Sequence, residues 1–119
     1  MRVLSVHGRA VVGAVATLLL AGTLRAQEAA FRGRVIDAAG QPVAAVPVVM
    51  HRVDGASGAE LGRDTTDAAG EYEVRFTAPP GDTAGIYFGI ARHEGAVYVG
   101  APVRGPLAAL TEYEIRIAP

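Results

Sequence analysis

The segment Glu71-Tyr72-Glu73-Val74-Arg75-Phe76 alternates strictly between charged and apolar side chains. In an extended strand, successive side chains point to opposite faces, so Tyr72, Val74 and Phe76 share one face. We predict that this face packs into a core and that the charged face meets water. The segment therefore predicts a half-buried β-strand, and it decides the fold class of the chain.

Other short apolar stretches with strand patterns lie on both sides of this segment. The chain has 15 glycines and 7 prolines scattered between these stretches, which favours many turns joining short strands. No long helical pattern follows residue 26. We therefore predict an all-β domain, a single antiparallel two-sheet β-sandwich of six or seven short strands. The further predicted strands are 31–37, 46–52, 61–66 at an edge, 85–93, 97–100 and 113–117.

The segment 1–26 has the order of a secretory signal peptide. Two arginines and a histidine precede an apolar run at 10–20, and small residues follow it. The run is shorter than the roughly 20 residues of a membrane-spanning helix, so an uncleaved anchor is the lesser alternative. We predict cleavage after Ala26, which leaves 27–119 as one secreted or periplasmic domain with a modest core and no stable membrane span.

The composition excludes several classes of function. The chain has no cysteine and no lysine, which excludes thiolate chemistry, zinc–thiolate sites and Schiff bases. All 12 acidic residues lie after residue 26, whereas only part of the 11 basic residues do. A nucleic-acid binder needs a basic face, and the arginines here are scattered singly. We expect no nucleic-acid partner.

Two related stretches resemble a known family. The first runs Gly33-Arg-Val-Ile-Asp37-Ala-Ala-Gly40-Gln-Pro42, and the second runs Thr66-Asp67-Ala-Ala-Gly70-Glu-Tyr72. They resemble the carboxypeptidase regulatory-like domain, which implies a transthyretin-like or prealbumin-like β-sandwich with no catalytic residues to carry over. Enzymes of the transthyretin fold that hydrolyse 5-hydroxyisourate end in Tyr-Arg-Gly-Ser. This chain has Tyr113-Glu-Ile-Arg116 near its end, so that activity is not expected.

The acidic and histidine side chains form no strong motif. His51 and His93, with Asp54 or Glu94, are candidates for a metal site, but no spacing brings three ligands together. We interpret both histidines as surface residues at strand ends. A hydrolytic triad of Ser57, His93 and an acid lacks the strand-to-helix elbow around the serine.

Three aspartates at turns are candidates for calcium binding. Asp37, Asp64 and Asp67 would offer oxygen ligands, but the alternating Asp-x-Asp-x-Asp-Gly run is absent. Aspartates that bond the backbone ahead of them explain both Asp-Ala-Ala-Gly stretches. We expect no metal and no cofactor.

A carbohydrate site would use Tyr87 and Tyr98, with His93 nearby. Tyr87 is out of phase with Phe88 and Ile90, which we predict to point inward, and Tyr98 is likewise out of phase with its apolar neighbours. Both tyrosines are therefore predicted to point outward on neighbouring strands, as a small aromatic platform. Tyrosine at a solvent-facing strand position is also ordinary β-propensity.

These observations favour an exported, non-catalytic β-sandwich module that acts as a structural or protein-interaction domain. It would present a sheet surface or edge to a protein partner or a cell-surface component. The alternative is a carbohydrate-binding accessory domain with a glycan partner, and a small hydrolase has the least support. We expect that the chain is not an enzyme.

Overall fold

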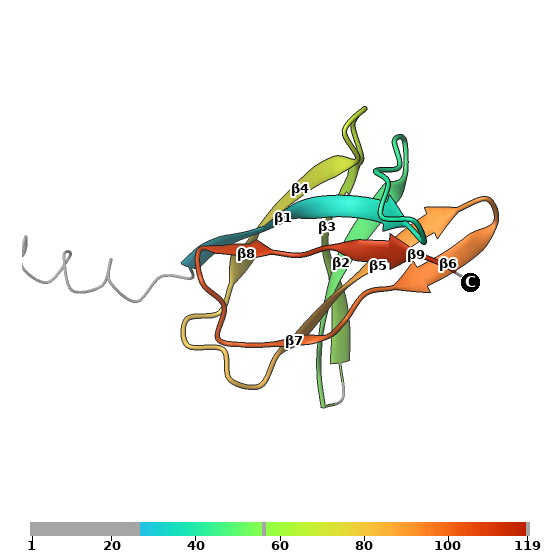
Figure 1. Ribbon diagram of the computed structural model, residues 1–119. Helices are drawn as coiled ribbons and strands as arrows, with labels where there is room; N and C mark the ends of the chain where they lie inside the picture. Colours follow the sequence, from blue (N-terminus) through green and yellow to red (C-terminus); the bar gives the residue numbers. More distant parts are fainter. Residues whose placement is uncertain (1–26, 56, 119) are drawn as a thin grey trace, which may run out of the picture.

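The computed structural model describes residues 27–55 and 57–118, and these form strands joined by short loops (Figure 1). No helix occurs in the described part of the chain, so none there is long and apolar enough to cross a membrane. The predicted signal peptide at 1–26 lies outside the described residues. The strands are β1 (Gln27–Asp37), β2 (Pro47–Asp54), β3 (Ser57–Thr65), β4 (Glu71–Ala78), β5 (Ile86–His93), β6 (Ala96–Val99), β7 (Val103–Arg104), β8 (Leu110–Glu112) and β9 (Ile115–Ile117).

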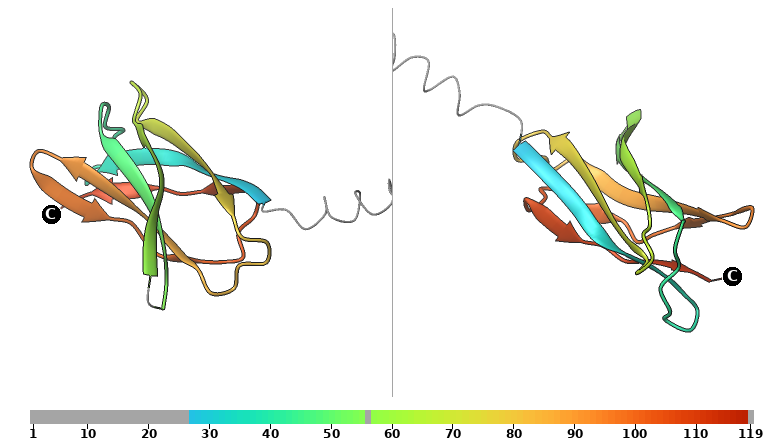
Figure 2. Two further views of the ribbon diagram at one scale, coloured as in Figure 1. Left: turned by 180° about the vertical axis from the view of Figure 1, so that it is seen from behind. Right: turned by 90° about the horizontal axis from the view of Figure 1, so that it is seen from above.

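The strands form two sheets that face each other, which confirms the predicted β-sandwich (Figure 2). The first sheet has the order β4-β1-β8, and β9 also pairs with β1. The second has the order β3-β2-β5-β6, and β7 pairs with β5. Most neighbours are antiparallel, but β8 and β9 run parallel to β1. Parallel pairing follows because the last strands return along β1 after crossing over from the other sheet.

An aromatic cluster fills the space between the sheets. The Phe31 ring centroid lies 5.6 Å from that of Phe76, 6.1 Å from Tyr87 and 5.5 Å from Tyr113. Aromatic side chains bury large apolar areas, so this cluster accounts for much of the core of so small a domain. The prediction for the β4 segment is confirmed, because Tyr72, Val74 and Phe76 are all buried.

Both Asp-Ala-Ala-Gly stretches form the same turn, as predicted. One oxygen of Asp37 accepts hydrogen bonds from the backbone N–H groups two and four residues ahead, and Asp67 does the same, all at 2.9 Å. Gly40 and Gly70 close the turns at φ 81° and 75°, a conformation that favours glycine. Asp64 also bonds backbone N–H groups, those of Thr65 and Glu73. The carboxylates of all three aspartates therefore accept hydrogen bonds from backbone N–H groups of the chain itself.

The predicted side-chain directions in β5 and β6 are wrong. Tyr87 points inward and is 0% exposed, whereas Ile86, Phe88 and Ile90 lie on the outer face and are partly exposed. Tyr98 is half-buried and packs against the core. Because β5 is apolar at nearly every position, its alternation could not distinguish the two faces. The pairing of β5 with β2 decides the direction, since it sets Tyr87 opposite Arg52.

Candidate functional site

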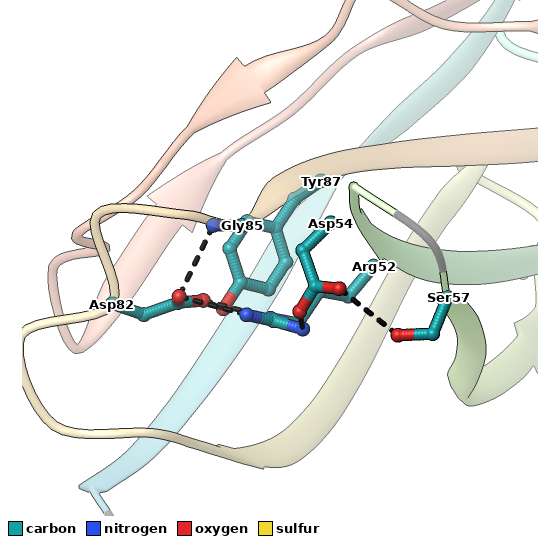
Figure 3. A network of polar contacts seen from close by, with 6 residues as sticks. All are labelled: Arg52, Asp54, Ser57, Asp82, Gly85 and Tyr87. Carbon is teal, nitrogen blue, oxygen red and sulfur yellow. Dashed lines mark hydrogen bonds and ion pairs between the residues drawn. The ribbon is translucent and has the colours of Figure 1, made fainter.

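A polar network lies at one end of the sandwich, where β2, β5 and the loop between β4 and β5 meet (Figure 3). Asp82, in that loop, accepts hydrogen bonds at 2.8 Å from both Nε and Nη2 of Arg52. The Tyr87 hydroxyl donates to the same carboxylate at 2.5 Å, and the Gly85 backbone N–H donates at 3.1 Å. Asp82 is 7% exposed, so this bidentate pair is shielded from water.

The network extends to the turn between β2 and β3. Nη1 of Arg52 donates to Asp54 at 2.6 Å, and the Ser57 hydroxyl donates to the other Asp54 oxygen at 2.9 Å. Neither histidine takes part in the hydrogen bonds of Ser57 in the described part of the chain. The hydrolytic triad of Ser57, His93 and an acid is therefore not assembled.

The protonation states of the network indicate a structural role rather than a catalytic one. The Arg52 guanidinium, followed by the Tyr87 hydroxyl, keeps the pKa of Asp82 far below its ordinary range. Burial, followed by the hydrogen bond to Asp82, raises the pKa of Tyr87. Asp82 therefore stays ionised and Tyr87 stays protonated, and each is engaged by a partner. The arrangement fastens the β4–β5 loop to β2.

A second set of tyrosine contacts connects the two sheets. The Tyr113 hydroxyl accepts from the Gly89 backbone N–H at 3.1 Å and donates to the Ala101 carbonyl at 2.5 Å. The Tyr72 hydroxyl donates to the Tyr113 carbonyl at 2.6 Å. Burial raises the pKa of both tyrosines. These hydroxyls are neutral donors in a structural role.

The ligand surface predicted from Tyr87, Tyr98 and His93 is not formed. Tyr87 is buried in the core and bonded to Asp82, so it is inaccessible to a ligand. Tyr98 covers the core, and His93 lies at the end of β5 with Nε2 3.8 Å from a Glu94 carboxylate oxygen. The three side chains share no exposed platform.

The metal-type residues are also dispersed. The His51 ring stacks on the Phe88 ring at 5.4 Å between centroids, on the face of the second sheet opposite to the core. Among residues 27–55 and 57–118, no three histidine, cysteine, aspartate or glutamate side chains gather into a group that would hold a metal ion.

The second sheet carries a surface that was not predicted from the sequence, which we call the apolar outer face. The strand register places side chains of β2, β5 and β6 in rows, such as Val49–Ile90–Val99 and His51–Phe88. Val97 is 51% exposed and Val99 is 64% exposed. The apolar outer face consists of Val49, His51, Val53, Ile86, Phe88, Ile90, Val97 and Val99.

Charged side chains surround the apolar outer face. Glu60 and Arg63 lie at its β3 edge and pair with each other at 2.6 Å. Arg92 lies beside Val97, and Arg104 lies beside Ile86. An apolar centre with a charged rim is typical of an interaction surface.

The outer face of the first sheet is different, because charged rows cross it. Arg32 lies between Glu73 on β4 and Glu112 on β8, and donates to Glu112 at 2.8 Å. Such cross-strand pairs suit a solvated face. The two outer faces of the sandwich therefore have opposite character, one charged and one apolar.

Comparison with known proteins identifies relatives of the fold. No family model matches the chain, and no curated protein sequence matches it. The 3-chlorocatechol 1,2-dioxygenase of Rhodococcus opacus 1CP aligns with a TM-score of 0.57 at 16% identity, over 79% of this chain and 60% of the enzyme. The chain shares its fold. This chain thus spans less than two thirds of that enzyme's length.

Two further dioxygenase structures agree with this result. The dioxygenase domain of a dioxygenase carbohydrate-binding protein fusion from Streptomyces sp. SirexAA-E has a TM-score of 0.51 at 16% identity, over 81% of each chain. The chlorocatechol 1,2-dioxygenase of Pseudomonas putida also has 0.51, at 13% identity, over 79% of this chain and 61% of the enzyme. At these identities the likeness establishes the fold alone.

These structures correct our expectation of a non-catalytic structural or protein-interaction module, together with its carbohydrate-binding alternative. They also correct the expectation that the chain is not an enzyme, because solved structures with this fold are dioxygenases. Our expectation rested on the lack of a catalytic motif in the sequence and on the resemblance to a domain family without catalytic residues. A fold does not carry that information, since catalysis depends on the residues placed on it.

The residues of the described part do not fit a resident iron of the oxygenase type. Such sites use histidine and carboxylate ligands that converge with open positions. Here His51 stacks against Phe88 on an outer face, and no group of three such ligands forms in the described segments. The hydroxyls of Tyr72 and Tyr113 donate to backbone carbonyls.

Proposed function

We propose that this chain is an exported subunit of an enzyme assembly, and that it functions as an assembled β-sandwich rather than as an isolated one. The observation that carries the proposal is the apolar outer face, whose exposed valines lie on β6. Figure 1 shows β6 joined to β5 in a hairpin. Contiguous apolar surface of this kind, ringed by charge, is disfavoured in water and marks a site of association.

Catalysis in this proposal belongs to the assembly. The fold is similar to that of proteins named as chlorocatechol 1,2-dioxygenases, and this supports oxygenase chemistry as the reaction to test first. Among the described residues no three histidine, cysteine, aspartate or glutamate side chains gather, and the proposal therefore assigns the reacting groups to the assembly as a whole. The signal-peptide pattern of residues 1–26 supports the export of this subunit.

The test places a photo-crosslinking amino acid at Val97 in the producing cells, with Thr77 as the matched control. Thr77 is exposed on β4, in the other sheet. We expect one cross-linked species of defined mass from position 97 and none from position 77, and we expect the purified assembly to consume oxygen with catechol. Equal cross-linking from both positions, or an intact assembly without oxygen uptake, would contradict the proposal.

A further inference from the structure

We propose that Asp54-Gly55, at the tip of the β2–β3 hairpin, is a site of spontaneous covalent modification at which aspartate converts to isoaspartate. It is the single Asp-Gly pair in the sequence. Glycine after an aspartate lets its backbone nitrogen approach the side-chain carboxyl, because no Cβ stands in the way. The modification is separate from the proposed assembly, and it needs only water.

The reaction balances without any other reagent. The Gly55 backbone nitrogen attacks Cγ of Asp54 and gives up its proton, one carboxyl oxygen leaves as water, and a succinimide ring closes. Water then adds to one of the ring carbonyls. Opening at the former backbone carbonyl gives isoaspartate, in which the main chain runs through Cβ and Cγ, whereas opening at Cγ restores aspartate.

The hairpin tip gives the ring room to close. The side chain of Asp54 is 34% exposed and Gly55 is exposed, so water reaches both groups. Gly55 has φ 28°, and apart from its chain neighbours no described atom lies within 4 Å of the place that a Cβ would take. Packing against the rest of the domain therefore does not block the approach of the nitrogen to Cγ.

Two contacts restrain the Asp54 carboxylate in the folded chain (Figure 3). Nη1 of Arg52 donates to one oxygen at 2.6 Å, and the Ser57 hydroxyl donates to the other at 2.9 Å. Arg52, followed by Ser57, also lowers the pKa of Asp54, and an ionised carboxylate is attacked less readily than a protonated carboxyl. The rate of modification is therefore set by how firmly these two side chains hold Asp54.

The other aspartates are poorer sites for the same reaction. Asp37, Asp64, Asp67 and Asp82 are each followed by alanine or threonine, whose Cβ hinders the approach of the nitrogen. Asp37 is the best internal comparison, because it also lies in a turn and its carboxylate is also held by hydrogen bonds. We expect the modification to be confined to position 54.

Conversion releases the hairpin tip from Arg52. In isoaspartate the main chain gains one carbon atom and the carboxylate is attached directly to Cα, so the present contacts of the Asp54 carboxylate are lost. Arg52 stays in place, because its Nε and Nη2 still donate to Asp82 at 2.8 Å. The change therefore stays at the turn and leaves the β4–β5 loop fastened.

The experiment incubates the purified exported chain at neutral pH for several weeks. Isoaspartate is located by peptide mapping with a protease that cleaves before aspartate but not before isoaspartate. We expect it at position 54 and not at position 37. Ser57→Ala is expected to speed its formation about fivefold, because one hydrogen bond to the carboxylate is removed. Ser57→Thr keeps a hydroxyl and is expected to react at the wild-type rate, and Gly55→Ala is expected to react as slowly as Asp37.

The same comparison in concentrated urea separates the folded contact from the local sequence. The bond between Ser57 and Asp54 is absent there, so wild type and Ser57→Ala are expected to react at equal rates. Isoaspartate that forms no faster at position 54 than at position 37, or equal rates for the folded wild type and folded Ser57→Ala, would overturn the inference. An acceleration by Ser57→Ala that is as large in urea as in the folded chain would overturn it as well.

Discussion

Replacing Gly33 by alanine is expected to destabilise the fold strongly, although it adds only one methyl group. A Cβ at this position would overlap the carbonyl oxygen of Tyr113 and lie 2.6 Å from its carbonyl carbon. Both are backbone atoms, and the Tyr72 hydroxyl bonds to the same carbonyl, so the last strands cannot retreat without losing that contact. We expect a loss of about 3 kcal/mol or more in the free energy of unfolding.

Urea denaturation of Gly33→Ala beside Gly40→Ala tests this expectation. Gly40 has φ 81° and no atom within 4 Å of an added Cβ, so its variant carries only the conformational penalty of about 1 kcal/mol. The Gly33 variant is expected to unfold at much lower urea than the Gly40 variant. Equal midpoints for the two variants would show that the approach of Tyr113 to Gly33 is not tight.

Removing the Asp82 carboxylate is expected to have the second large effect. Asp82→Ala would leave the Arg52 guanidinium, whose side chain is 19% exposed, without its bidentate partner, and the buried Tyr87 hydroxyl without its acceptor. Breaking a shielded pair in this way costs about 3 kcal/mol, because the remaining charge stays desolvated. Asp54 still holds one nitrogen of Arg52, which keeps the loss from being larger.

The matched control for Asp82 is Glu112→Ala. Glu112 pairs with Arg32 at the same 2.8 Å, but the two side chains are 69% and 52% exposed, so water screens the pair and its loss is expected to cost far less than the loss of Asp82. Losses of equal size in both variants at neutral pH would contradict the shielding of the Arg52–Asp82 pair.

The stabilisation by Asp82 is expected to depend on pH. The folded-state pKa of Asp82 is lowered, so its contribution to stability is present above the unfolded pKa of about 3.9 and is lost as pH falls through the folded-state value. The free energies of unfolding of wild type and Asp82→Ala should therefore converge in acid.

Strands with one polar and one apolar face could be predicted from the sequence. The β4 segment alternates without exception, so burial of Tyr72, Val74 and Phe76 followed directly from the period of a strand. The two Asp-Ala-Ala-Gly turns were predictable for a similar reason, because aspartate and glycine act through their own local backbone. Both features depend only on residues that are neighbours in the sequence.

The features that depend on distant contacts could not be predicted. The β5 segment Ile86–His93 is apolar on both faces, so either face could have been the inner one. The choice is made by Arg52 and Asp82, which come together beside the Tyr87 hydroxyl only in the folded chain. The same choice creates the apolar outer face, because it turns Phe88 and its neighbours outward. The missed signal was the presence of apolar residues on both faces of β5 together with valines on β6.

The covered state of the apolar outer face can be measured most directly by thiol labelling, because the chain has no cysteine of its own. A cysteine placed at Val99, or at Thr77 as a control, would be the single thiol of its variant. We predict that in the producing cells a maleimide reagent labels position 99 more slowly than position 77, although both positions are exposed in the isolated chain. Labelling of position 99 in the cells at the rate of position 77 would contradict the claim that this face is covered.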